Sequence, residues 1–111
     1  MLIYKIFRAA EWAELQKQSV TRGSSVDIAD GYVHFSTAEQ TFETAIKHFS
    51  GESDLMLLAL NADILGDSLK WEPSRGGALF PHLYRELRIS DVLWSKPLPL
   101  IDGQHKFPEL T

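Results

Sequence analysis

The segment GYVHFS, residues 31–36, places a histidine and a serine two positions apart, just before a predicted helix. Because side chains alternate along a strand, His34 and Ser36 share one face, and the apolar Val33 and Phe35 take the other. An imidazole that titrates near neutral pH beside a hydroxyl is a candidate pair for proton transfer or ligand binding. A direct Ser–His nucleophile pair is disfavoured, because residues i and i+2 of a strand lie about 6.7 Å apart. The alternative is structural, with the histidine bonded to a backbone carbonyl and the serine capping the helix.

A second group of chemically capable side chains lies in LKWEPSRGGALFPHLYREL, residues 69–87. The segment supplies an acid, a cation, a base and stacking rings: Glu72, Arg75, His82, Trp71 and Tyr84. The glycine pair between them could approach a phosphate through backbone amides, or simply turn the chain. The alternative for the histidine is a packed neighbour in an extended segment.

Metal and thiol chemistry are not expected. The chain has no cysteine, which excludes thiolate nucleophiles, disulfides and cysteine zinc sites. The two histidines and Glu72 match no metal-ligand spacing such as H-E-x-x-H. His48, on a helix flank, and His105, in the tail, receive no role.

Size and charge narrow the function classes further. A chain of 111 residues is expected to form one domain, residues 1–111. The formal charge of −4 with scattered basic residues argues against DNA binding. There is no apolar run of roughly 20 residues, and the start lacks a signal-peptide core, so we expect a cytoplasmic protein with no membrane partner.

The order of predicted elements indicates an α+β fold with a curved, mainly antiparallel sheet. Alternation and β-formers predict strands over 2–7, 32–36, 54–62, 69–73, 82–87 and 90–98. Helical spacing predicts a helix over 9–18. Turn residues predict a loop over 20–31, and the tail over 97–110 is expected to be irregular.

A second helix is predicted from about Thr37. Ser36 followed by Glu39 matches a capping box, and Gly51 supplies a stop. The expected apolar stripe of this helix comprises Ala38, Phe42, Ala45, Ile46 and Phe49. Phe42 and Ile46 should pack beneath Val33 and Phe35.

Three separated motifs, GYVHFSTAEQ, LKWEPSRGGALFPHLY and the opening IYKI with AAEW, closely resemble the family catalogued as domain of unknown function 952. The resemblance continues through LPLIDGQHKFP and covers nearly the whole chain. That family has been grouped with the ADP-ribosyltransferase-like fold, whose members bind NAD or ADP-ribose-like ligands between two small sheets. The resemblance therefore implies this fold and a nucleotide-like ligand, with NAD as a candidate substrate and no required cofactor.

Residue roles follow from the same resemblance. In that fold a basic residue on the first strand holds ribose, a Tyr or Ser follows, and a later Glu stabilises an oxocarbenium-like centre. By position these roles fall to Lys5, to Ser36 or His34, and to Glu72. Lys5 stands where the fold has His or Arg.

A further branch of that fold, the RNA 2′-phosphotransferases, uses Arg and His around a phosphate. The corresponding residues here are Arg75, His34 and His82. Trp71 or Tyr84 would stack a base or nicotinamide.

Two functions follow from these observations. The first is an enzyme that acts on NAD, ADP-ribose or a related nucleotide or phosphorylated ligand, by glycosidic or phosphate transfer or hydrolysis. Its catalytic residues would be His34, Glu72 and His82, with Lys5, Ser36, Trp71, Arg75 and Tyr84 binding the ligand. The second is a non-catalytic module that binds a nucleotide or small anion, which Lys5 at the first position favours.

Overall fold

The computed structural model describes residues 1–110, apart from the side chain of Arg75. Its helices are α1 (Ala9–Gln18), α2 (Ser25–Asp30) and α3 (Ala38–His48), with 3₁₀ segments at Ala62–Ser68, Arg75–Gly77 and Ile89–Asp91. Its strands are β1 (Leu2–Arg8), β2 (Val20–Thr21), β3 (Val33–His34), β4 (Leu55–Asn61), β5 (Leu69–Pro73), β6 (Leu79–Leu83), β7 (Leu87–Arg88), β8 (Val92–Leu98), β9 (Leu100–Ile101) and β10 (Gln104–His105). The predicted α+β class is confirmed.

The longest sheet is antiparallel and has the order β1-β4-β8. The apolar run of β4 is buried on both faces because it occupies the centre of this sheet, as its composition predicts. Lys5 of β1 lies opposite Leu58 of β4 in the register. One edge of β1 is therefore paired along its length, and the other edge faces the second sheet.

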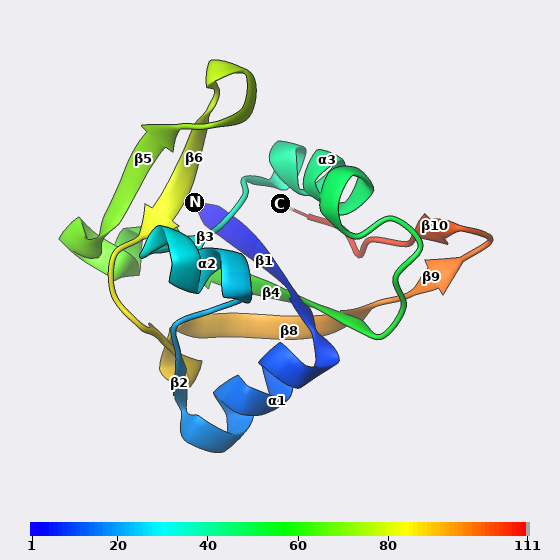
Figure 1. Cartoon of the computed structure of the whole chain (residues 1–111), viewed down its shortest axis with the longest axis horizontal. Coiled ribbons are helices and arrows are strands. Elements are labelled where there is room, and N and C mark those ends of the chain that lie inside the picture. Colours follow the sequence, from blue (N-terminus) through cyan, green and yellow to red (C-terminus); the bar gives the residue numbers. More distant parts are fainter. Residues whose placement is uncertain (111) are drawn as a thin grey trace.

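The second sheet has the order β3-β6-β5. It meets the first sheet at a single bridge, where the Tyr4 N–H donates to the Ser36 carbonyl at 2.7 Å and the Ser36 N–H donates to the Tyr4 carbonyl at 2.9 Å. Figure 1 shows the β5–β6 hairpin at one end of the long axis and the β9–β10 hairpin at the other. The two sheets diverge beyond the bridge.

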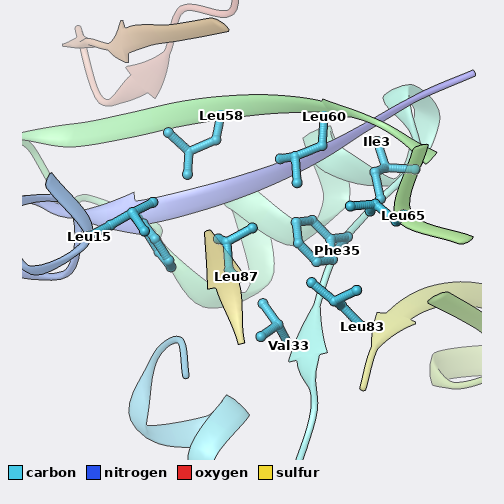
Figure 2. Packing of buried hydrophobic residues seen from close by; sticks show 10 residues of the cluster. Ile3, Leu15, Val33, Phe35, Leu58, Leu60, Leu65, Leu83 and Leu87 are labelled. Atoms are coloured by element: carbon cyan, nitrogen blue, oxygen red, sulfur yellow. The ribbon is translucent and has the colours of Figure 1, made fainter. Parts of the chain in front are cut away.

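Apolar side chains cover both faces of the first sheet. On one face, strands, α1 and the segment around Phe35 converge on a single cluster that includes Leu58, Leu60 and Leu83 (Figure 2). On the other face, Leu57 and Ala59 pack with Tyr4 and with Ala45 of α3. Alternation along β4 therefore supplies both clusters from one strand.

The segment predicted as a loop over 20–31 contains two short elements, β2 and α2. Ser24 caps α2 in a box with Asp27, in which each side chain accepts a hydrogen bond from the other residue's backbone N–H. Gly31 ends the helix with a φ of 86°. The turn-forming residues at 23–25 and 30–31 are thus the two ends of a helix, and reading them as one loop was wrong.

The start of α3 lies one residue later than predicted. Thr37, not Ser36, is the N-cap, and its box partner is Gln40 rather than Glu39. The buried positions of α3 are Thr41 and Ala45.

The predicted stripe of α3 is wrong at two positions. Phe42 is 47% exposed and Ile46 is 72% exposed, so neither packs beneath Val33 and Phe35. The ring of Phe42 instead contacts Phe107 of the tail, with centroids 4.6 Å apart. The tail also forms the β9–β10 hairpin and is not wholly irregular.

Candidate functional site

A cavity of about 380 Å³ lies where β1 and the second sheet diverge, with α2 and α3 on its sides. Its polar wall includes one or two side chains from each neighbouring element: Lys5, Asp27, His34, Ser36, Thr44 and His82. Buried rings, among them Phe35 and Phe49, contribute the apolar wall. The cavity thus lies between polar and aromatic surfaces.

The two histidines from the separate motifs are neighbours. His34 of β3 lies directly opposite His82 of β6 in the register, and their ring centroids are 5.2 Å apart. Tyr32 packs against both rings, with centroid distances of 4.7 Å to His34 and 4.3 Å to His82. Antiparallel pairing therefore unites residues that are far apart in the sequence.

The His82 imidazole is 2% exposed, and its two nitrogens differ. Nδ1 lies 2.8 Å from Glu72 Oε1, across the β5–β6 pair. Nε2 is buried and has no hydrogen-bond partner among the described residues. Because a carboxylate only accepts hydrogen bonds, Nδ1 is assigned the proton, and the lone pair of the neutral ring is on Nε2.

Glu72 stands behind His82 and also accepts a 2.6 Å hydrogen bond from the Tyr84 hydroxyl. The hydrogen bond from Tyr84, and to a lesser extent the one from His82, holds the pKa of Glu72 below its usual value. The same contact with Glu72 raises the pKa of Tyr84 to about 12. At neutral pH the carboxylate is therefore ionised and the phenol protonated, which fixes the direction of both hydrogen bonds.

Asp27 is the centre of a second network and is 1% exposed. Its carboxylate lies 2.7 Å from Lys5 Nζ and 2.6 Å from His34 Nδ1, and accepts a 3.1 Å bond from the His34 N–H. The other ring nitrogen of His34 lies 3.0 Å from Asp30 Oδ2. Both nitrogens thus face carboxylates, an arrangement that the imidazolium form satisfies fully.

Burial alone would raise the pKa of Asp27. The hydrogen bond from His34 and the ion pair with Lys5 outweigh burial and hold that pKa well below its usual range. A buried lysine and a buried carboxylate are tolerated here because each neutralises the other. Lys5, 8% exposed, is held toward the cavity by this pair.

Six of the predicted site residues either line the cavity or support a residue that does. Lys5, His34, Ser36 and His82 line the cavity, and the Ser36 hydroxyl lies 3.0 Å from that of Thr44. Glu72 and Tyr84 support His82 from β5 and the end of β6.

One further predicted residue is not brought into this arrangement. Trp71, 38% exposed, alternates to the opposite face of β5 from Glu72. The Arg75 side chain lies outside the described part of the chain. No three His, Asp or Glu side chains of the described residues are grouped to hold a metal ion.

Sequence reasoning missed Asp27. The signal was present, because Ser24 and Asp27 have the spacing of a capping box, the same rule that was applied to the later helix. Recognising that box would have predicted a short helix beginning at residue 25, with the acidic Asp27 in its first turn, shortly before His34. The composition of the segment instead favoured a loop.

Comparison with known proteins gives a family and a solved relative. The family model described as Protein of unknown function (DUF952) matches residues 6–95. The chain is similar to protein CC0527 from Caulobacter crescentus, a structural-genomics target: the crystal structure shares 51% identity with a TM-score of 0.91, over 96% of this chain and 94% of that chain. The solution NMR structure of CC0527 gives 51% identity and a TM-score of 0.84, over 94% of this chain and 90% of that chain. No curated protein matches the chain.

Proposed function

The chain belongs to the DUF952 family, and we propose that it is a cytoplasmic enzyme acting on a small anionic ligand, nucleotide-like or phosphorylated, with His82 as its general acid–base residue. The observation that carries the proposal is the state of the His82 ring. One nitrogen is bonded to Glu72, and the other is buried beside a cavity, with no hydrogen-bond partner in the described part of the chain. A buried imidazole nitrogen without a partner is costly for stability, which is the expected condition of a group kept for a ligand.

The Glu72–His82 pair has the logic of a carboxylate that orients a catalytic imidazole. The carboxylate fixes the tautomer and stabilises the imidazolium that forms when Nε2 takes a proton. In this proposal Glu72 positions the base and does not contact the ligand. That role differs from the ribose contact that the family resemblance implies.

The cavity lining favours an anionic ligand with a planar portion. Its described lining contains one carboxylate, that of Asp27. The basic side chains in the same lining are Lys5, Arg8, His34, His48 and His82. The volume lies at the lower end of the range of roughly 300–1,000 Å³ for small-molecule sites. A mononucleotide or sugar phosphate fits this range better than whole NAD, and phosphate or glycosidic transfer or hydrolysis are the reactions that such a ligand offers.

A second candidate is a binding module without turnover. The observation that favours it is that Lys5 and His34 are already satisfied by carboxylates. That module would use the cavity for a small anion and would not depend on proton transfer at His82.

A ligand screen followed by turnover assays separates these candidates. We expect thermal stabilisation by at least one of AMP, ADP-ribose, NAD and ribose 5-phosphate, by about 2.7 kcal/mol at one hundred times the dissociation constant. With that ligand, His82→Asn should lower turnover by about 10²–10⁴-fold and leave affinity within a few-fold. His105→Asn, on the β9–β10 hairpin, is the matched control and should retain turnover.

Three outcomes would count against the proposal. Binding without phosphate or nicotinamide release by the wild type would favour the binding module. Equal turnover in His82→Asn and the control would remove the catalytic assignment. If none of the four compounds binds, the nucleotide-like ligand class is wrong.

A further inference from the structure

The short helix α2 is attached to the rest of the fold mainly through one side chain. Asp27 is its buried residue, whereas its apolar Val26 and Ile28 are 59% and 48% exposed. Gly23 and Gly31 flank the helix with φ angles of 99° and 86°. A helix with so little apolar contact depends on polar bonds to keep its place.

The groups that hold the Asp27 carboxylate are those that bind phosphate in proteins. Lys5 Nζ, at 2.7 Å, and His34 Nδ1, at 2.6 Å, belong to strands of the two different sheets. Backbone N–H groups of His34 and Ser24 complete the set at 3.1 Å and 2.9 Å. The ammonium of Lys5, a ring nitrogen of His34 and two backbone amides thus surround one anion, and a bond from an ammonium to an anion is charge-assisted.

Asp27 also lies between two cavities. It lines the larger cavity together with Lys5 and His34. It lines a second cavity, of about 130 Å³, together with Arg22 and Tyr32. Withdrawing this side chain would expose the two cationic groups and open the wall between the cavities.

We propose that Lys5 and His34 form a phosphate-binding site that the Asp27 carboxylate occupies, so that an incoming phosphate or phosphomonoester displaces Asp27 and releases α2 as a lid. The inference rests on the proposed function in that the ligand is anionic. It deepens that function by naming the contacts of the anionic group and the segment that must move.

The exchange is favourable on charge. A phosphomonoester carries about −1.5 to −2 charges at neutral pH and three acceptor oxygens, against −1 and two oxygens for a carboxylate. Lys5 and His34 together contact two carboxylates of α2, those of Asp27 and Asp30, and both leave with the helix. A phosphate dianion supplies the two negative charges that these carboxylates take away.

The test is binding of inorganic phosphate and AMP to Asp27→Asn by calorimetry. Asn keeps the shape of the side chain and removes the competing charge, so we expect at least tenfold tighter binding than in the wild type. Asp67→Asn, exposed in the 62–68 segment, changes the net charge equally and should bind as the wild type does. Adding Lys5→Met to Asp27→Asn should abolish the gain. Equal or weaker binding in Asp27→Asn would overturn the proposal.

Hydrogen exchange of the wild type tests the lid without any substitution. The N–H groups of Ile28 and Gly31 are bonded to the Ser24 and Asp27 carbonyls. Saturating phosphate should accelerate their exchange, and unchanged or slower exchange would overturn the proposal even if Asp27→Asn does not fold. The same acceleration by phosphate is expected in His82→Asn. If phosphate does not accelerate exchange in the wild type while its turnover still depends on His82, the lid alone is refuted. If phosphate accelerates exchange but the wild type turns over no ligand, the acid–base function alone is refuted.

Discussion

At the scale of single residues, the chemistry of the site depends on pairs of side chains rather than on unusual residue types. His82 is directed by Glu72, and Glu72 is in turn directed by Tyr84. His34 and Lys5 share Asp27 in the same way. His82, His34 and Lys5 are therefore each oriented by at least one carboxylate partner.

Tyr84→Phe tests the support of His82. Removing the hydroxyl removes the leading cause of the lowered pKa of Glu72, so that pKa should rise toward its usual value. Glu72 would then become protonated at higher pH, and the acid limb of the kcat/KM profile should move to higher pH. The profile of Tyr84→Phe measured beside that of the wild type checks this, and superimposable acid limbs would show that the phenol does not support the site.

Asp27 should make stability depend on acidity. Its pKa is lowered in the folded protein, so its contribution is present at neutral pH and is lost as pH falls below the ordinary value of 3.8. We expect Asp27→Asn to be less stable than the wild type at pH 7 and to lose less stability between pH of about 5 and 2. Urea unfolding across that range measures both slopes, and parallel slopes would contradict the ion-pair account.

Several residues that line or support the cavity could be singled out from the sequence, but their pairing could not. His34, Ser36, Glu72 and His82 stand out by type and motif, whereas the contact between the two histidines depends on the register of β3 against β6. Register is set by tertiary packing and not by local spacing. Asp27 was hidden because its helix is short and bounded by turn-forming residues.

At the scale of elements, long periodic segments follow the sequence and short ones do not. β1, α1, β4 and α3 lie within a few residues of their predicted bounds because each carries a sustained apolar pattern. α2 has six residues and β9 has two, too few for a period to emerge. The apolar spacing of α3 predicted Phe42 on the buried face, whereas packing against β1 and β4 buries the neighbouring Thr41.

Thr37→Ala tests the position of that cap. Loss of the hydroxyl that accepts from the Gln40 N–H should cost about 1 kcal/mol of unfolding free energy. Thr37→Ser keeps the acceptor and is the matched control. Urea denaturation that finds Ser as costly as Ala would show that the hydroxyl does not cap the helix.

At the scale of the whole molecule, one buried sheet supports two apolar clusters while the second sheet diverges from it to leave the cavity. The sheet β1-β4-β8 is continuously paired, and the candidate site lies along the less paired edge of β1. No helix among the described residues is long and apolar enough to span a membrane.

Two substitutions distinguish the core from the periphery. Leu58→Ala should lower the free energy of unfolding by about 2–5 kcal/mol, because Leu58 is 0% exposed at the centre of β4. Phe42→Ala should cost only about 1 kcal/mol, because half of the ring is already in water. Chemical denaturation of both variants measures the two losses. A larger loss for Phe42→Ala than for Leu58→Ala would show that α3 buries Phe42, contrary to the orientation described here.

Binding of a small anionic ligand beside His82 can be followed residue by residue in a two-dimensional NMR titration. The imidazole signals of His82 and His34 and the amide of Lys5 should shift together and saturate with AMP or the ligand found by screening. The signals of His105, in the β9–β10 hairpin, should remain in place. Saturable shifts confined to residues away from the cavity, or no shifts with any phosphorylated ligand, would contradict the account.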